Sequence, residues 1–493
     1  MSSVNSKMAK GAVWMVLFKL VERSLGLVST IILARLLVPA DFGLIAMAMS
    51  IIAILELLGA FGFDMALIQN ADAEPKDYNT AWTFNVLFGI TSAVIVIALA
   101  IPAATFYAEP RLENLIYVLA IGLAVQGFEN IGIVAFRKQL EFNKEFKFQI
   151  TKKLASFIVT VFLAYLLQSY WALVAGMLTG RIFGVMLSYY SHPYRPWFSL
   201  SARHELFHFS KWLFFNNVLL LLRTRSIDFI IGKTSGAHGL GLFSIAHEVS
   251  SLPSTELIAP INRAVFPGYA KMSHDMCELR NGFLKVFSII IMFALPAGAG
   301  IAVTADLIVA VLLGPKWLET VPLIQILAFY GIVSAMQTNT IYVHLAVGKP
   351  KVTSYLFLAQ AVIQIPLLVW LSIEYGITGA AWGVLGVSIL VLPANLYLVS
   401  HRLDLRFRDL ASILWRPIVA VIAMFFAVEY ALSLLTDGTG ILGDLLLLLL
   451  GVGLGAMTFI VTVLGLWLLS ARPDGAEQYL LDNIKYRLQR ALM

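Results

Sequence analysis

The sequence is short of charged residues, and this shortage excludes most classes of soluble protein. Only 13% of the 493 residues are charged, whereas 59% are hydrophobic, and the mean hydropathy is +0.84. In a soluble domain about a quarter of the residues are charged. The composition therefore predicts an integral membrane protein built from apolar helices.

Residues for metal, disulfide or covalent chemistry are also scarce. The single cysteine, Cys277, excludes an intramolecular disulfide and a cysteine metal cluster. The run His204-Glu205-Leu206-Phe207-His208 matches the zinc-protease pattern, but no third ligand lies nearby in the sequence, and a zinc site needs at least three. We interpret the run as an amphipathic turn at the membrane surface. The sequence predicts no metal, no cofactor and no enzyme activity.

Long hydrophilic loops are missing as well. The apolar runs that can cross about 30 Å of hydrocarbon predict fourteen helices, and the connections between them leave no room for a soluble catalytic domain. The predicted spans are residues 11–36, 42–69, 79–106, 112–136, 151–168, 170–190, 207–232, 240–264, 282–305, 321–346, 352–374, 377–400, 411–433 and 442–470. The fold class is thus an all-α polytopic membrane protein.

A signal peptide is another feature that the sequence does not display. Lys19, Glu22 and Arg23 interrupt the first apolar run, and no small-residue cleavage site follows it. We expect a retained first span.

Basic residues are distributed unevenly between the two sides of the predicted spans. Most of the 35 lysines and arginines fall on the side of the N-terminus, and the opposite side holds only Arg35, Arg111, Lys233 and Lys316. Cytoplasmic loops of membrane proteins carry such an excess. The pattern predicts that both termini are cytoplasmic. It also explains the net charge of +6 without a nucleic-acid partner, because no nucleic-acid-binding motif accompanies it.

The first predicted helix carries a polar stripe. Lys19, Glu22, Arg23, Gly26 and Thr30 recur at helical spacing and share one face. Each charge near the centre of a membrane helix costs about 2.5 to 3.5 kcal/mol, so such residues usually face a bundle interior or a watery cavity. Two interpretations stay open: the stripe lines a cavity, or Glu22 neutralises its two basic neighbours as a structural pair.

An internal repeat with a constant offset divides the chain. It pairs Trp14 with Trp212, Arg35 with Lys233, Gly43 with Gly241, Leu44 with Leu242, and Ala48 with Ala246. Because six predicted helices separate the copies, both have the same orientation, and an axis along the membrane normal should relate them. We predict an N-lobe of six helices (residues 1–200), a C-lobe of six (201–402), two extra helices (403–470) and a cytoplasmic amphipathic tail (471–493). The stretch 137–153 is predicted to be a second amphipathic helix at the inner membrane surface.

Two blocks of sequence resemble a known family. The first is ARLLVPADFGL at residues 34–44, followed by FGF at 61–63 and ALIQ at 66–69. The second is RSID at 225–228 with IG at 231–232, then GLGLFSIA at 239–246, Pro253 and FP at 266–267. Together they resemble Wzx-type polysaccharide flippases, the polysaccharide-transport branch of the multidrug/oligosaccharidyl-lipid/polysaccharide (MOP) superfamily, and above all colanic-acid-exporter-like lipopolysaccharide biosynthesis proteins.

The resemblance implies a specific activity. Family members flip an undecaprenyl-diphosphate-linked oligosaccharide repeat unit from the cytoplasmic to the periplasmic leaflet of the bacterial inner membrane during surface polysaccharide biosynthesis. Two six-helix lobes plus two extra helices do this by alternating access. The implied partners are the lipid-linked oligosaccharide, membrane lipid, a coupling H⁺ or Na⁺ ion, and other polysaccharide assembly proteins.

The candidate site follows from the charge of a diphosphate. Arginine offers planar, permanently charged donors for phosphate oxygens. The candidate substrate-binding residues are Lys19, Glu22, Arg23, Arg181, Asn217, Arg223, Arg225 and Arg263. Arg223 is preferred over Arg225 as a cavity residue because the two lie on opposite helix faces.

Acidic residues within the spans could couple transport to an ion gradient. The candidates are Glu22, Glu56, Asp228 and Glu248. Salt bridges to the arginines are the alternative role for each of them.

Two rival functions remain. A cation-coupled multidrug exporter of the same superfamily is disfavoured by the intramembrane arginines, since cationic drugs prefer an acidic cavity. A membrane glycosyltransferase or ligase is disfavoured by the short outer loops.

Overall fold

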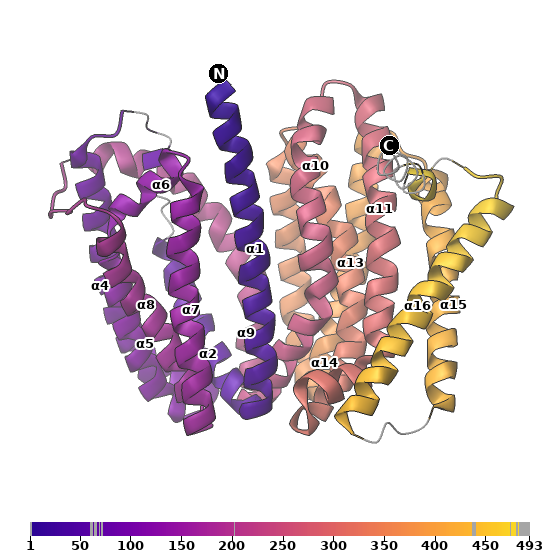
Figure 1. Cartoon of the computed structure of the whole chain (residues 1–493), viewed down its shortest axis with the longest axis horizontal. Helices are drawn as coiled ribbons and strands as arrows, with labels where there is room; N and C mark the ends of the chain where they lie inside the picture. The colour runs from indigo at the N-terminus through magenta and orange to yellow at the C-terminus, as the bar shows by residue number, and fades with distance from the viewer. Residues whose placement is uncertain are drawn as a thin grey trace. The chain divides into compact units, whose positions relative to one another are not determined.

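In the computed structural model, the described backbone covers residues 2–59, 63, 67–68, 70, 72–201, 203–435, 440–473, 475–479 and 482, and side chains are described within these ranges except at 2–13, 16, 57–59 and 203–223. Every regular element in these ranges is a helix (Figure 1). The chain divides into two compact units, Met1–Gly241 and Leu242–Met493. The lobe, extra-helix and tail boundaries expected from the sequence stay a prediction.

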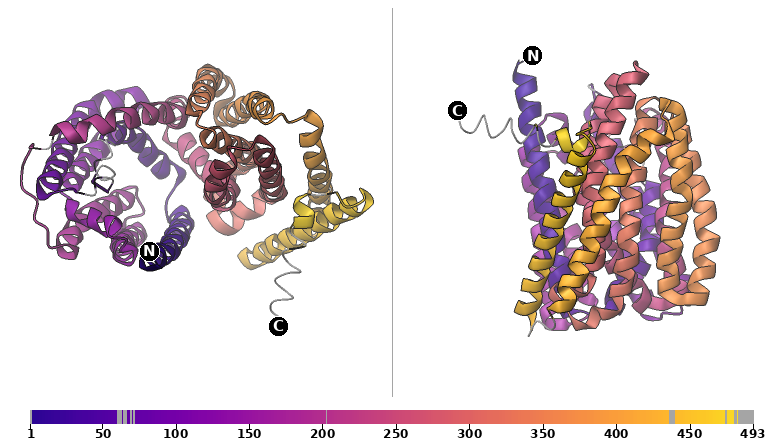
Figure 2. Two further views of the ribbon diagram at one scale, coloured as in Figure 1. Left: turned by 90° about the horizontal axis from the view of Figure 1, so that it is seen from above. Right: turned by 90° about the vertical axis from the view of Figure 1, so that its right-hand side faces the viewer.

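The first unit is a ring of helices when viewed from above (Figure 2, left). Its elements are α1 (Ser2–Leu36), α2 (Pro39–Gly59), α4 (Pro75–Tyr107), α5 (Arg111–Gly127), η1 (Ile131–Ile133), α6 (Val134–Lys138), α7 (Phe142–Leu167), α8 (Trp171–Ser191) and the first part of α9 (Arg203–Leu252).

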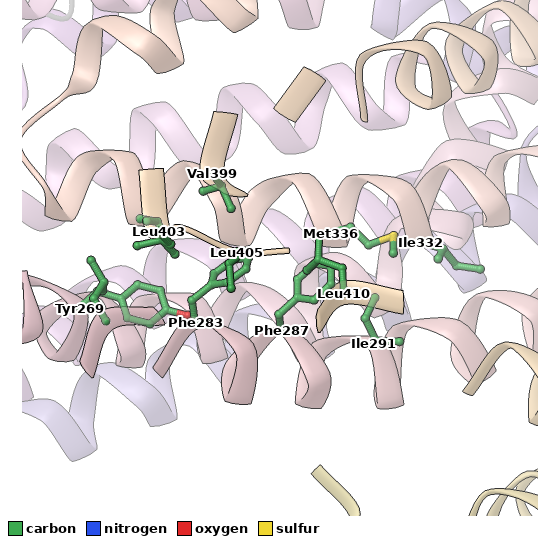
Figure 3. Packing of buried hydrophobic residues seen from close by; sticks show 12 residues of the cluster. Tyr269, Phe283, Phe287, Ile291, Ile332, Met336, Val399, Leu403, Leu405 and Leu410 are labelled. Atoms are coloured by element: carbon green, nitrogen blue, oxygen red, sulfur yellow. The ribbon is translucent and has the colours of Figure 1, made fainter. Parts of the chain in front are cut away.

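The second unit has a continuous apolar core. Tyr269, Phe283 and Phe287 are fully buried there and pack against residues of three further helices (Figure 3). The unit contains the end of α9, η2 (Pro253–Ile258), α10 (Ala259–Met272), α11 (Met276–Val303), α12 (Ala305–Ile308), η3 (Val309–Leu313), η4 (Pro315–Thr320), α13 (Val321–Ala346), α14 (Pro350–Leu403), α15 (Phe407–Leu434) and α16 (Ile441–Leu469).

The helices agree with the predicted fold class. Among the described residues, nine helices are long and apolar enough to cross a membrane, or ten if the bent pair Arg111–Gly127 and Ile131–Lys138 forms one span. Helix α14 contains two predicted spans joined at Gly376, whose φ of 61° is not helical. Helix α9 has a similar break at Gly236, with φ 66°. The count of fourteen crossings therefore stays a prediction.

The glycines that the repeat pairs lie against each other within the first unit. A Cβ atom on Gly43 would lie 1.7 Å from the carbonyl oxygen of Ala237, and one on Gly241 would lie 1.8 Å from that of Pro39. Pro39 and Ala237 are themselves related by the offset of the repeat. The contact is thus reciprocal between repeat-related positions of α2 and α9, and only glycine permits such a close approach.

The VPADFG motif of the first block forms the corner between α1 and α2. The Asp41 side chain is 6% exposed. One of its oxygens accepts a hydrogen bond from the Val38 amide at 3.2 Å, and the other accepts one from the Tyr170 amide at 3.2 Å. A single carboxylate therefore joins this corner to the turn between α7 and α8, which explains why the motif marks the fold.

An extended segment, residues 192–200, follows α8 and runs along α4. The Asn79 side-chain oxygen accepts from the Tyr194 hydroxyl at 2.8 Å and from the Trp197 amide at 3.0 Å. One helical turn later, the Thr83 hydroxyl accepts from the Ser199 amide at 2.9 Å. Side chains at helical spacing thus satisfy backbone groups that have no sheet partner.

The chain after α16 folds back onto the second unit. Glu477 lies 2.9 Å from Arg416 of α15, and both side chains are almost fully buried. The Trp467 ring donates a hydrogen bond to the Pro473 carbonyl at 3.0 Å. Most of the predicted amphipathic tail lies outside the described residues.

Candidate functional site

A polar cavity lies inside the first unit. It has a larger compartment of about 570 Å³ and a smaller one of about 370 Å³. The two compartments share lining residues and are therefore adjacent. The shared residues are Glu56, Gln126, Glu129, Gln149 and Lys152. We call these two compartments together the polar cavity.

Acidic and basic side chains balance in the smaller compartment. Its walls carry Glu22, Glu56 and Glu129 together with three cationic side chains, those of Lys152, Lys153 and Arg181. These residues come from helices α1, α2, α5, α7 and α8 or the turns that follow them. The sequence predicted a cationic site, and the described part of the cavity is instead lined by paired charges.

Glu22 of α1 joins two lysines. One carboxylate oxygen lies 2.7 Å from the Lys19 Nζ atom, and the other lies 2.9 Å from the Lys153 Nζ atom of α7. Glu22 thus pairs with one of the two basic neighbours expected from the sequence, Lys19, and also lines the cavity; its pairing with Arg23 stays a prediction. Lys153 is 131 residues away from Glu22 in the sequence, so helical spacing could not predict this contact.

Arg181 of α8 is the most enclosed cation of the smaller compartment. Its side chain is 14% exposed, and its Nη2 atom lies 2.9 Å from the Glu56 Oε1 atom of α2. The Nη1 atom is buried and makes no hydrogen bond within the described part of the chain. The arginine stem crosses α5 at Gly122, where a Cβ atom would lie 3.0 Å from the Arg181 Cδ atom.

Helices α7 and α8 approach each other along a row of glycines. A Cβ atom on Gly176 would lie 1.6 Å from the Thr160 hydroxyl oxygen, and one on Gly184 would lie 2.6 Å from the Lys152 Cδ atom. Small residues at this spacing let membrane helices pack closely. The row positions Lys152, whose Nζ atom lies 3.7 Å from a Glu129 oxygen.

The larger compartment adds neutral polar and aromatic groups. Asn85, Ser92 and Phe88 of α4 line it together with the amides of Gln126 and Gln149. Carboxamides and hydroxyls both donate and accept hydrogen bonds, which suits hydroxyl-rich ligands. The polar cavity thus combines groups that can hold an anion with groups that can hold a carbohydrate.

The other candidates from the sequence are found in several places. Arg23 is exposed on α1. Arg225 pairs with Asp228 on the same helix at 3.1 Å, as one of the sequence alternatives allowed. Arg263 and Glu248 are exposed residues of the second unit. Their binding and coupling roles stay predictions.

Two candidates fall on positions whose side chains are outside the described set. Asn217 and Arg223 both lie in the part of α9 for which only the backbone is described. The same holds for the histidines of the zinc-protease pattern at 204–208.

Several cavity residues were not singled out from the sequence. Lys152, Lys153, Gln126 and Gln149 line the cavity, but none of them was predicted to have a binding role. The predicted surface helix at 137–153 included three of them, and in the structure residues 142–153 form the first part of the long helix α7. The spacing of Gly176, Gly180 and Gly184 was the available signal, since it predicts a close helix neighbour for that face of α8.

Comparisons with known proteins agree with this fold. The model of a family described as polysaccharide biosynthesis protein matches residues 32–322. Lipopolysaccharide biosynthesis protein WzxC of Escherichia coli K12 is 26% identical over 445 residues, which cover 88% of this chain and 89% of that protein. Succinoglycan biosynthesis transport protein ExoT of Rhizobium meliloti is 22% identical over 466 residues, 94% of each chain.

A solved structure has the same fold. The structure described as lipid II flippase MurJ in an inward closed conformation superposes with a TM-score of 0.75 at 13% identity, over 92% of this chain and 99% of that one. The family match covers more than half of the chain and confirms the resemblance seen in the two sequence blocks. The chain has the fold of that structure and belongs to the polysaccharide biosynthesis protein family.

Proposed function

We propose that this chain is a transporter that flips an undecaprenyl-diphosphate-linked oligosaccharide between membrane leaflets during surface polysaccharide biosynthesis. The observation that carries the proposal is the polar cavity, which places cationic side chains beside amides and an aromatic ring inside an apolar helical unit. The names of the relatives, which refer to polysaccharide biosynthesis and transport, support the same class of substrate.

Each part of such a substrate matches a different part of the cavity. Arg181, Lys152 and Lys153 would hold the diphosphate, because guanidinium and ammonium groups form strong charge-assisted hydrogen bonds to phosphate. Gln126, Gln149 and Asn85 would bind sugar hydroxyls. The prenyl chain would stay in the lipid, since its hydrocarbon gains nothing by entering a polar cavity.

The proposal also covers the direction of transport and the ion gradient that drives it. The basic residues predict cytoplasmic termini in the bacterial inner membrane, so transport would run from the cytoplasmic to the periplasmic leaflet by alternating access. Glu22 and Glu56 line the cavity and are our candidates for coupling to H⁺ or Na⁺. Other polysaccharide assembly proteins would act before and after this step.

The decisive experiment is translocation of a lipid-linked oligosaccharide in vesicles that contain the purified chain. We expect wild type to move the glycan and Arg181→Gln to lose most of this activity. Arg111→Gln, which removes a cation outside the cavity that pairs with Glu109, should retain it. Imposing and collapsing H⁺ and Na⁺ gradients would identify the coupling ion.

Two results would contradict the proposal. If wild type leaves the glycan in place but exports a cationic dye, the chain is a multidrug exporter of the same superfamily. If it elongates or transfers the glycan instead, the chain is a glycosyltransferase or ligase.

A further inference from the structure

Two cations of the polar cavity are paired with carboxylates of the same cavity. Arg181 is in contact with Glu56, and Lys153 is in contact with Glu22. These four groups come from four different helices, α1, α2, α7 and α8. Each contact therefore depends on the tertiary fold and does not arise from neighbours in the sequence.

We propose that Glu22 and Glu56 occupy the positions of the substrate's phosphate groups, and that the incoming diphosphate displaces them from Lys153 and Arg181. This inference rests on the proposed function and deepens it. Carboxylate and phosphate oxygens compete for the same donors because both accept charge-assisted hydrogen bonds from guanidinium and ammonium groups.

In the Arg181–Glu56 pair, the geometry indicates that the arginine is fixed and that the glutamate can be displaced. The Arg181 side chain is 14% exposed, whereas Glu56 is 41% exposed. The arginine stem is held against α5 at Gly122, so the cation stays in place while the more exposed carboxylate can rotate away. Displacing Glu56 therefore requires no movement of the arginine.

Arg181 also has unused capacity for an anion. Glu56 contacts the Nη2 atom, while the buried Nη1 atom makes no hydrogen bond to described residues. A buried donor without an acceptor is unfavourable, because it has lost its hydrogen bonds to water. A phosphate group can accept from both terminal nitrogens of one guanidinium, so substrate would satisfy a donor that the carboxylate leaves unpaired.

The exchange explains how the empty transporter returns. An uncompensated cation in a low-dielectric interior is strongly unfavourable. Glu56 and Glu22 compensate Arg181 and Lys153 whenever no phosphate group is in contact with these two cations. The two acidic residues should therefore matter most for the return step of the cycle.

A competing carboxylate and a structural ion pair predict opposite effects of removing Glu56 on substrate affinity. If the Glu56–Arg181 contact only holds the helices together, removing either partner should weaken substrate binding. If Glu56 competes with substrate, Glu56→Gln should bind substrate more tightly and Arg181→Gln more weakly. The two single variants therefore distinguish the possibilities.

The experiment uses the purified full chain and two probes, inorganic pyrophosphate and a lipid-linked oligosaccharide. We expect Glu56→Gln and Glu22→Gln each to bind both probes about tenfold more tightly, which corresponds to about 1.4 kcal/mol. In vesicles, exchange of labelled for unlabelled lipid-linked oligosaccharide should persist in these variants, while net transport falls. Glu56→Asp keeps the charge and should restore net transport in part.

Glu74→Gln is the matched control, because Glu74 pairs with Lys76 in an exposed position outside the cavity. It should change neither binding nor the ratio of exchange to net transport. Thermal unfolding of each variant identifies any that fails to fold, and the Glu22 and Glu56 variants provide independent versions of the test.

The outcomes separate this inference from the proposed function. If wild type transports the glycan but Glu56→Gln and Glu22→Gln bind the probes as wild type does, or more weakly, the displacement mechanism is wrong and the flippase function stands. If wild type does not move the glycan at all, the proposed function itself fails.

Discussion

The Arg181 side chain packs directly against the backbone of Gly122, which leaves no room for a side chain at position 122. A Cβ atom at position 122 would lie 2.9 Å from the Leu178 Cδ2 atom and 3.0 Å from the Arg181 Cδ atom. Gly122→Ala should displace the guanidinium and weaken substrate binding about tenfold. In an unobstructed helix interior, replacing glycine by alanine stabilises the helix by up to about 1 kcal/mol. Gly122→Ala should not show this increase in stability.

Gly453→Ala in α16 is the comparison for this substitution. No heavy atom lies within 4 Å of the position that a methyl group would take there, so thermal unfolding should show equal or higher stability and transport should not change. Equal binding by Gly122→Ala and wild type would show that the position of Arg181 is not critical.

His192 gives the segment 192–200 a dependence on pH. Its Nδ1 atom accepts a hydrogen bond from the Tyr194 amide at 3.1 Å. The pKa of His192 is lowered from its ordinary value of 6.5, first because the ring is partly buried and then because Lys144 and Arg195 lie nearby. The folded chain therefore binds this proton less readily than the unfolded chain does.

The sign of the effect follows from linkage. The stabilisation by neutral His192 is complete above the unfolded pKa and is lost as the pH falls below about 6.5 toward the lower folded pKa. Wild type should lose thermal stability over this window, and His192→Asn should lose less. Identical pH profiles for the two proteins would rule out this contribution.

At the scale of secondary-structure elements, the crossing of α2 and α9 depends on two glycines. A methyl group on Gly43 or Gly241 would overlap a backbone carbonyl of the other helix, and backbone cannot move aside as a flexible side chain can. We expect Gly43→Ala or Gly241→Ala to destabilise the fold by about 3 kcal/mol or more. Gly26→Ala, with no atom within 4 Å, should be tolerated in the same thermal assay.

The segment after α16 is attached to α15 by one buried ion pair. Arg416→Met would leave Glu477 buried without a countercharge, since both side chains are almost fully buried, and should cost about 3 to 5 kcal/mol. The double variant Arg416→Met/Glu477→Leu should recover most of this loss, because an apolar pair needs no desolvation of charge. Chemical unfolding of the two variants measures the difference, and equal loss in both would exclude an unpaired charge as the cause.

At the scale of the whole molecule, the distribution of lysine and arginine predicts sidedness. The single cysteine, Cys277, is exposed and belongs to the segments predicted to be cytoplasmic. A membrane-impermeant maleimide should label it in inside-out vesicles and not in right-side-out vesicles. Lys316→Cys in a Cys277→Ser background should give the opposite pattern, and labelling of Cys277 from the outer face would invert the predicted topology.

The sequence by itself determined the membrane class, the helical fold and the family. Hydropathy and charge bias are sums over many residues, so errors at single positions do not alter them. The repeat was also visible in sequence, and the reciprocal contact of Gly43 and Gly241 gives its pairing a physical reason. The count of fourteen crossings stays a prediction, although the predicted spans 352–374 and 377–400 separate at the break that Gly376 makes in α14.

Only the tertiary structure decided which charges meet. The first-helix stripe placed Glu22 beside Lys19, since both lie within one turn. The contacts of Glu22 with Lys153 and of Glu56 with Arg181 join helices that are far apart in the sequence. Periodicity defines the face of a helix and says nothing about the helix that packs against it. The sequence predicted a cationic site and left salt bridges to its carboxylates open. Packing in the first unit brings Glu22 to Lys153 and Glu56 to Arg181, because a charge buried among apolar helices needs a partner.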